Sequence, residues 1–258
     1  MTTCNIVLLD IEGTTTPISF IHDCLFPYVT ENLTGFLKEN WNSSEFQSYI
    51  QLLREQALKD VENGMTDAVI IPKESESDVK SIQHAVTNNI QWQMRVDRKI
   101  AALKSFQGYM WKSGFVSGEL KGVIYDDVVT AFKQWKDAGI NIYIYSSGSV
   151  AAQKLLFAYS DKGNLSEYID GYFDTTIGSK LESQSYLNIY NEIGIQSPPS
   201  SILFLSDNIN EIIAAKKAGL QTAIVERPGN PPLNFNNGSN NEHILVIHSF
   251  LEVFTNRQ

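Results

Sequence analysis

Short apolar runs recur along the chain at lengths typical of buried β-strands. Four of them indicate strands of a parallel sheet that is covered on both faces. They span residues 6–9, 140–145, 202–205 and 222–225. A fifth run, at residues 244–247, is predicted to form a last strand at the edge of the sheet.

Helical patterns alternate with these strands. The strand at 140–145 is followed by serine-rich residues and then by an amphipathic helix over 150–158. A helix over 211–218 follows the strand at 202–205, and another covers 127–138; glycines end both. This alternation predicts an α/β fold with a Rossmann-like parallel sheet, in which ligands bind at the carboxyl ends of the strands.

A long helical interval separates the first strand from the second. Its apolar residues recur at helical spacing and show no strand signal, which is typical of a small bundle. The four helical patterns cover residues 23–40, 46–61, 79–94 and 97–111, and the glycines at 108, 114, 118 and 122 are placed near the return hinge. We therefore predict an α-helical cap domain at 20–120, inserted into a core made of 1–19 and 121–258.

Composition narrows the class of protein. Hydrophobic residues make up 43% of the 258 positions, which is ample for a packed core, and the formal net charge is −9. A nucleic-acid or anionic-membrane partner would require a basic surface, so we expect neither. Two cysteines, no signal peptide and no membrane-spanning run predict a cytoplasmic protein, with a nuclear pool left open. No unusual apolar surface pattern is evident, so we expect a monomer.

The strongest chemical signal follows the first predicted strand, where Asp10 and Glu12 stand two residues apart. An aspartate at the end of a buried strand can attack phosphorus as a nucleophile. Glu12 can protonate the leaving oxygen and then deprotonate the attacking water. In an isolated Asp-x-Glu, the aspartate more often caps the next segment and the glutamate is solvated. The buried strand before the pair, and Gly13-Thr14 after it, favour the catalytic interpretation.

Two serines and a lysine follow later strands. Ser146 and Ser147 stand between a strand and a helix, where hydroxyls and free amides bind phosphate oxygens, although serine is also the commonest helix cap. Lys180 precedes a helix and can neutralise a phosphoryl oxygen or hold the nucleophilic carboxylate. A single lysine at such a position is usually solvated, so this interpretation depends on the other motifs.

A further carboxylate, Asp207, ends the strand at 202–205. With Asp10 it can supply the hard oxygen ligands that Mg²⁺ prefers. Glu211, one helical turn further on, is either a partner of these ligands or a helix N-terminal acid favoured by the helix dipole, and we favour the second. All these motifs fall on the same edge of the predicted sheet.

In this order, Asp10-x-Glu12-Gly-Thr, Ser146, Lys180 and Asp207 resemble the four motifs of the haloacid-dehalogenase superfamily of phosphohydrolases. The helical insertion resembles that superfamily's cap domain. A closer resemblance, over nearly the whole chain, is to the enolase-phosphatase family of methionine salvage, also called acireductone synthases. Segments 10–18, 97–99, 107–111, 143–149 and 227–230 carry it. Glu12, where most of the superfamily has aspartate, is this family's pattern.

This resemblance implies a bifunctional enzyme of L-methionine salvage. It would enolise 2,3-diketo-5-methylthiopentyl-1-phosphate and then remove phosphate, giving the acireductone 1,2-dihydroxy-3-keto-5-methylthiopentene. It implies Mg²⁺ as cofactor. The implied ligands are Asp10, Glu12 and Asp207, with Asp10 also the nucleophile, and the implied substrate-binding residues are Ser146, Ser147 and Lys180. The enolisation base stays open between Glu12 and a cap residue, as do the residues that recognise the methylthio tail.

Other functions are compatible with parts of the pattern. A general small-metabolite phosphatase without the enolase step is the main alternative, and the cap decides between the two. A dehalogenase would not need Glu12, and an inactive binding protein predicts eroded motifs, whereas all are present. The four histidines have no ligand spacing among themselves, so we assign no metal or catalytic role to His22, His84, His243 and His248.

Overall fold

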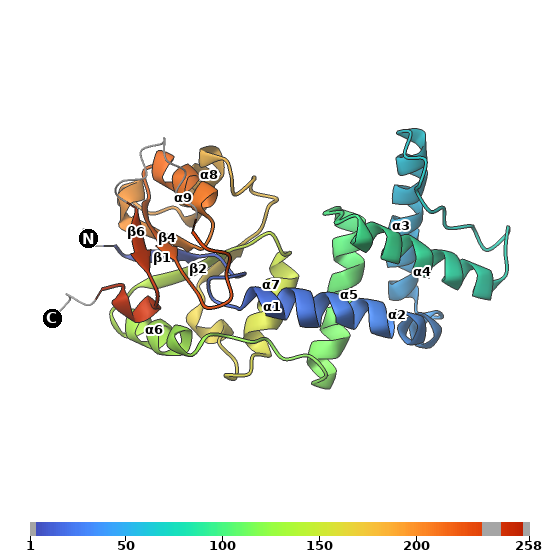
Figure 1. The fold of residues 1–258 in the computed structure, drawn as a ribbon, viewed down its shortest axis with the longest axis horizontal. Helices are drawn as coiled ribbons and strands as arrows, with labels where there is room; N and C mark the ends of the chain where they lie inside the picture. Colours follow the sequence, from blue (N-terminus) through green and yellow to red (C-terminus); the bar gives the residue numbers. More distant parts are fainter. Residues whose placement is uncertain (1–3, 234–243, 255–258) are drawn as a thin grey trace. The chain divides into compact units, whose positions relative to one another are not determined.

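The computed structural model describes residues 4–233 and 244–254, and the chain divides into two compact units (Figure 1). Met1–Asp23 and Gly118–Gln258 form the first, called here the α/β unit, and Cys24–Ser117 forms the second, the helical unit. The chain passes from one unit to the other after Asp23 and after Ser117, within a few residues of the positions 20 and 120 that the sequence suggests. No helix in the described part of the chain combines the length and apolar character needed to cross a membrane.

A parallel sheet in the order β3-β2-β1-β4-β5-β6 forms the centre of the α/β unit. Its strands are β1 (Ile6–Leu9), β2 (Asn141–Tyr145), β3 (Gly171–Phe173), β4 (Ile202–Ser206), β5 (Gln221–Val225) and β6 (Leu245–Ile247). The five predicted strands are confirmed, with β6 at an edge. β3 was not predicted, because three half-buried residues beginning with glycine carry no periodic signal.

The order of the strands fixes where a ligand can bind. From β1 the chain adds β2 and β3 on one side, and it then returns to place β4 on the other side of β1. In doubly wound sheets of this order, ligands bind outside the carboxyl ends of the strands at the point where the winding reverses. Asp10 follows β1 and Asp207 follows β4, so both carboxylates stand at that point.

Helices cover both faces of the sheet, with α8 and α9 on one face and α6 and α7 on the other (Figure 1). Their bounds are α6 (Asp126–Asp137), α7 (Val150–Ala158), α8 (Ser183–Ile193) and α9 (Ile209–Lys217). Tyr186 of α8 and Ile212 of α9 share a core cluster with Ile6 and Leu8 of β1. Since successive strand residues point to opposite faces, the full burial of Val7 between them shows that both faces are covered.

Single turns complete the α/β unit, and one of them spans its boundary with the helical unit between Asp23 and Cys24. They are α1 (Ile18–Phe20), the π-helical turn η1 (Ile21–Leu25) and the 3₁₀ turns η2 (Ser166–Tyr168), η3 (Pro199–Ser201) and η4 (Phe250–Glu252). The turn η1 runs into the first helix of the helical unit. Pro27 follows it and has no N–H to donate, which interrupts the regular helical ladder at this entry.

The four predicted helices of the second unit are present. They are α2 (Phe26–Asn40), α3 (Ser44–Glu62), α4 (Val79–Arg95) and α5 (Ala101–Ser117). One core of aliphatic and aromatic side chains joins all four, including Leu33, Ile50, Val86 and Phe106. The helical unit therefore has a hydrophobic core of its own.

Two details of the helical unit differ from the prediction. The predicted fourth helix began at Asp97, but Asp97 has φ +49° and ends α4 instead. Its N–H donates to the Met94 carbonyl at 3.1 Å and the next N–H, of Arg98, donates to the Gln93 carbonyl at 3.0 Å, which is the Schellman pattern of helix ends. Gly108 and Gly114, predicted near the hinge, lie inside α5, and Gly118 just beyond it has φ +82°.

Candidate active site

Asp10 is held in a fixed position at the end of β1. Its N–H extends the sheet by donating to the Leu205 carbonyl at 3.0 Å. Its carboxylate Oδ1 accepts a hydrogen bond of 2.7 Å from the Ile11 N–H. Only 5% of Asp10 is exposed, so this carboxylate is largely removed from water. The structure thus gives the predicted nucleophile one defined orientation.

Lys180 lies between two carboxylates. Its Nζ is 2.7 Å from Asp10 Oδ1 and 2.6 Å from Glu211 Oε2. Ser206 Oγ donates to Glu211 Oε2 at 2.8 Å and lies 3.3 Å from Asp10 Oδ2. Glu211 is therefore a buried ion-pair partner of Lys180. Glu211 also lies in the first turn of α9, as the preferred interpretation expected, but its pairing with Lys180 was not predicted, because spacing along α9 does not reveal a lysine that arrives from another loop.

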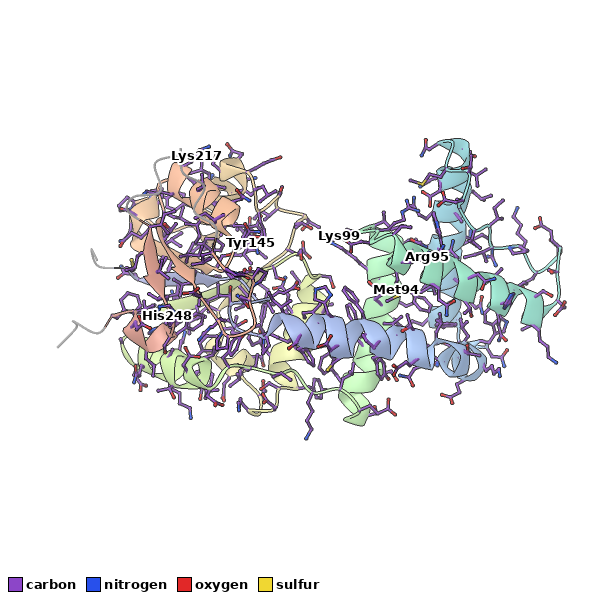
Figure 2. The ribbon with its side chains drawn as sticks, in the orientation of Figure 1. Met94, Arg95, Lys99, Tyr145, Lys217 and His248 are labelled. Carbon is purple, nitrogen blue, oxygen red and sulfur yellow. The ribbon has the colours of Figure 1, made fainter. Side chains whose placement is uncertain are left out.

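Tyr145 supports the loop that carries Lys180. It is the last residue of β2 (Figure 2), and its hydroxyl donates to the Gly178 carbonyl at 2.9 Å. The Lys180 Nζ lies 5.9 Å from the centroid of its ring. Burial raises the pKa of Tyr145 to about 12, so the hydroxyl stays a donor at neutral pH. Sequence reasoning placed Tyr145 in a strand and in a segment of the family resemblance, but gave it no role in the site.

The loop after β1 places Glu12 near Asp207, which follows β4. Gly13 has φ +70°, and a Cβ there would lie 2.2 Å from Asp207 Oδ2, so only glycine fits. Asp207 is anchored by its N–H, which donates to Thr14 Oγ1 at 3.1 Å. The Glu12 carboxylate is partly exposed and lies 3.2 Å from His22 Nε2.

The contact with His22 was missed from the sequence. Nine residues separate Glu12 from His22, which lies in the π-helical turn η1, and no regular spacing connects the two. His84 and His248 lie elsewhere in the described structure, and His243 lies outside the described residues. Arg227 and Asn230, which both contact the loop after β1, were noted in the sequence only as part of a family resemblance.

Ser146 and Ser147 leave the sheet beside Asp10, since Ile144 of β2 pairs with Leu9 of β1. The cap of helix α7 is neither of them. Ser149 caps it, by accepting a hydrogen bond of 3.3 Å from the Ala152 N–H. Ser146 is buried, and its Oγ accepts from the Gly148 N–H at 3.3 Å. The simple capping explanation for the two serines is therefore excluded.

Lys180 contacts the carboxylates of Asp10 and Glu211, and those of Glu12 and Asp207 lie near enough to interact with it electrostatically. Burial raises the pKa of Asp207 to about 7, and the negative charge of Asp10 adds to the effect. Burial and Asp10 likewise raise the pKa of Glu211 to about 7, and burial raises the pKa of Glu12. Burial opposes charge on Lys180, but Asp10 and Glu211 outweigh it and raise the pKa of Lys180.

This donor set fits a hard divalent cation. Mg²⁺ usually takes one or two protein carboxylates and completes its coordination with water and substrate phosphate. Among the described residues, no group of three or more His, Cys, Asp or Glu side chains is arranged to hold a metal ion by itself. Buried carboxylates in excess of the available ammonium would be relieved by added positive charge, which is the arrangement expected of an incomplete Mg²⁺ site.

Known proteins share both the sequence and the fold. A model of the haloacid dehalogenase-like hydrolase family matches residues 4–219. Enolase-phosphatase E1 of Xenopus tropicalis is 50% identical over 244 residues, which cover 94% of this chain and 93% of that protein. The chain belongs to the enolase-phosphatase E1 family of haloacid dehalogenase-like hydrolases. The predicted family and fold class are thereby confirmed.

Two further matches extend over both units. A relative from Arabidopsis thaliana, named as a probable bifunctional methylthioribulose-1-phosphate dehydratase/enolase-phosphatase E1, is 48% identical over 232 residues. The match covers 90% of this chain but 45% of that longer protein. The crystal structure of the UTR4 protein from Saccharomyces cerevisiae has a TM-score of 0.74 and 33% identity, covering 96% of this chain and 98% of that one. The enolase-phosphatase E1 resemblance therefore includes the helical unit.

Proposed function

We propose that this protein is a Mg²⁺-dependent enolase-phosphatase that converts 2,3-diketo-5-methylthiopentyl-1-phosphate into the acireductone and inorganic phosphate in methionine salvage. The observation that carries the proposal is the 50% identity to an enolase-phosphatase across 94% of the chain. The geometry around Asp10 and Lys180 gives that identity a chemical basis. A general phosphatase would need only the α/β unit's chemistry, whereas the similarity extends through the helical unit.

Asp10 carries the phosphate-transfer chemistry in this proposal. One carboxylate oxygen attacks phosphorus, the bond from phosphorus to the substrate oxygen breaks, and an aspartyl-phosphate forms. Glu12 donates a proton to the departing oxygen. Water then attacks the aspartyl-phosphate and gives a proton to Glu12. This step releases phosphate and returns Asp10 and Glu12 to their starting forms. The raised pKa of Glu12 favours its protonated form at the start of this sequence.

The remaining site residues bind charge. Ser146 and Ser147 supply polar groups for the phosphoryl oxygens, and Lys180 offsets their charge while keeping Asp10 oriented through the 2.7 Å contact. Asp10, Glu12 and Asp207 would hold the Mg²⁺. When bound, the cation supplies the positive charge that lets a phosphate dianion approach a carboxylate nucleophile.

The enolase step needs a base near the same phosphate. The base takes a proton from the carbon between the ketone and the phosphate ester, a carbon–carbon double bond forms, and the ketone oxygen takes up a proton to become the enol hydroxyl. Glu12 and a residue of the helical unit are the two candidates for this base, and we propose that the helical unit acts as the cap that recognises the methylthio tail. The two activities named for the Arabidopsis thaliana relative support the substrate, because loss of water from methylthioribulose-1-phosphate gives this diketone phosphate.

The proposal is tested by incubating the purified protein with the diketone phosphate and Mg²⁺. Released phosphate and enol absorbance are followed together, and Asp10→Asn is measured in parallel. We expect both signals to require Mg²⁺, and Asp10→Asn to lower phosphate release by about 10³-fold or more, since loss of a catalytic nucleophile removes the main reaction path.

Other results would point elsewhere. Cleavage of simple phosphate esters without any enol signal would make the protein a general phosphatase. Absence of both signals with folded protein would contradict the catalytic assignment itself. The monomeric state and the cytoplasmic location stay predictions, which light scattering after size-exclusion chromatography and cell fractionation can test.

A further inference from the structure

The segment after β5 forms a tight turn of four residues, Arg227-Pro228-Gly229-Asn230. The Asn230 N–H donates to the Arg227 carbonyl at 3.1 Å, and Gly229 has φ +90°. Proline at the second position and a glycine of positive φ at the third are the requirements of a type II turn. This turn brings its first and last residues close together, on a short and stiff support.

Both ends of the turn bind the loop that follows Asp10. Arg227 Nε donates to the Thr14 carbonyl at 3.0 Å, and Asn230 Nδ2 donates to the Gly13 carbonyl at 2.9 Å. These are successive carbonyls of one loop. The turn therefore fixes the backbone three and four residues beyond the proposed nucleophile.

Arg227 gives this turn a rigid base. Its guanidinium is buried, and Nη1 donates to Asp127 Oδ2 at 2.9 Å and to the His248 carbonyl at 3.2 Å. It also lies against two rings, 4.5 Å from the centroid of Tyr125 and 4.7 Å from that of Phe250. A planar, permanently charged group with this many contacts has little freedom to move.

Asn230 makes a second contact, with a carboxylate, that plays no part in forming the turn. Its Nδ2 lies 3.1 Å from Asp207 Oδ2. The Gly13 carbonyl oxygen only accepts hydrogen bonds, and so does the ionised Asp207 carboxylate, so the amide presents its N–H groups to both. A Cβ on Gly13 would lie 2.9 Å from this nitrogen as well as 2.2 Å from Asp207 Oδ2. The loops after β1, β4 and β5 thus meet at one carboxamide.

We propose that Asn230 is a positioning residue of the metal site, whose N–H groups hold the Asp207 carboxylate and the Gly13 carbonyl in the arrangement that binds Mg²⁺. This inference rests on the Mg²⁺ site proposed above. Groups that orient a metal-binding carboxylate typically change metal affinity by about 10-fold to 100-fold. Arg227 serves Asn230 indirectly, by anchoring the turn.

The test is a calorimetric Mg²⁺ titration of the full-length, metal-free protein. For Asn230→Ala we expect the Kd for Mg²⁺ to rise by about 10-fold to 100-fold. Half-maximal phosphate release should require a correspondingly higher Mg²⁺ concentration, because fewer sites hold the cation at a given concentration. The matched control is Asn164→Ala, which removes only local hydrogen bonds to Ser166, of 3.0 Å and 2.6 Å, and should leave the Kd unchanged.

Each other outcome has a definite meaning. An unchanged Kd together with a lower melting temperature of metal-free Asn230→Ala would overturn the inference and leave the turn a support of the fold. If Asn230→Ala does not fold, Asn230→Ser, which keeps a short donor, should give an intermediate Kd, and a wild-type Kd would overturn the inference. Absence of Mg²⁺ binding to the wild-type protein would overturn the metal site and this inference with it. The phosphate-release assay tests the enzymatic proposal separately.

Discussion

Each of the two units contains a buried ionic cluster, and the two are built differently. In the helical unit, Asp60 pairs with Arg98 through two hydrogen bonds, one of them 2.8 Å between Nη2 and Oδ1. Hydrogen bonding to Arg98 lowers the pKa of Asp60. In the α/β unit, Lys180 pairs with Asp10 and Glu211 while the carboxylates of Glu12 and Asp207 lie nearby, and the pKa values of Asp207 and Glu211 are raised to about 7.

The difference in charge balance between the two clusters indicates different roles, stability for the Asp60–Arg98 pair and chemistry for the cluster around Lys180. One carboxylate paired with one guanidinium is balanced in charge and needs no added ion. In a cluster with more carboxylates than cations, the carboxyl groups ionise less readily than they would in water. Such raised pKa values occur most often at reacting sites of proteins. The negative charge of such a cluster would repel a phosphate dianion, so a bound cation is needed for the phosphate to approach. The α/β unit is therefore the one equipped for chemistry.

The largest effect is expected from removing the ammonium of the unbalanced cluster. Lys180→Met leaves Asp10 and Glu211 without their shared partner, and we expect kcat/KM for phosphate release to fall by about 10²-fold to 10³-fold. Steady-state kinetics at saturating Mg²⁺ measure it. Lys217→Met, at an exposed lysine at the end of α9 (Figure 2), is the control and should retain full activity. Equal activities of the two variants would remove Lys180 from the site.

The next effect falls on the balanced pair. Asp60→Ala leaves the mostly buried Arg98 guanidinium without its partner, so the free energy of unfolding should fall by about 3 kcal/mol. Chemical denaturation measures the change, and exposed Glu62 at the end of α3 provides the control. Glu62→Ala should stay within about 0.5 kcal/mol of wild type. A loss of similar size in both variants would mean that the pair is not special.

The smallest effect is a difference in pH dependence. Asp207 and Glu211 have folded pKa values of about 7, above their usual 3.8 and 4.5, so the folded state binds more protons than the unfolded state between these limits. Stability of the metal-free protein should fall as pH rises from about 4 to 7, and stabilisation by Mg²⁺ should grow over the same range. Asp60 acts oppositely, since its lowered pKa gives stability that is lost only in acid.

Melting temperatures with and without Mg²⁺ from pH 5 to 8 test this sign. A stabilisation by Mg²⁺ that does not depend on pH would contradict proton competition at Asp207 and Glu211. In Asp60→Ala, the increase in melting temperature on adding Mg²⁺ should keep its wild-type pH dependence, because the two clusters belong to different units.

The sequence predicted what depends on local pattern. Buried strands and amphipathic helices appear as runs of apolar residues, and carboxylates at strand ends follow from them, so Asp10 and Asp207 could be placed at the sheet edge from the pattern alone. Contacts between distant loops have no such signal. The pairing of Glu211 with Lys180, the contact of His22 with Glu12 and the two bonds of Asn230 arise only when separate segments meet.

Local exceptions also escaped the pattern. Asp97 ends a helix in a left-handed conformation that glycine usually supplies, so the apolar periodicity on both sides of it suggested an earlier helix start. The strand β3 is too short for a period to be visible, although the loop that carries Lys180 follows it. Such features depend on tertiary contacts that override intrinsic preference.

The place of β1 in the sheet also affects how the protein is made. Its partners β2 and β4 lie far along the chain, and Asp10 and Ser206 are 196 residues apart. During synthesis the helical unit, whose hydrophobic core lies within residues 24–117, can fold while β1 still has no neighbour. Asp10 is thus synthesised before the helical unit, and its surroundings are completed only when β2 and β4 have followed.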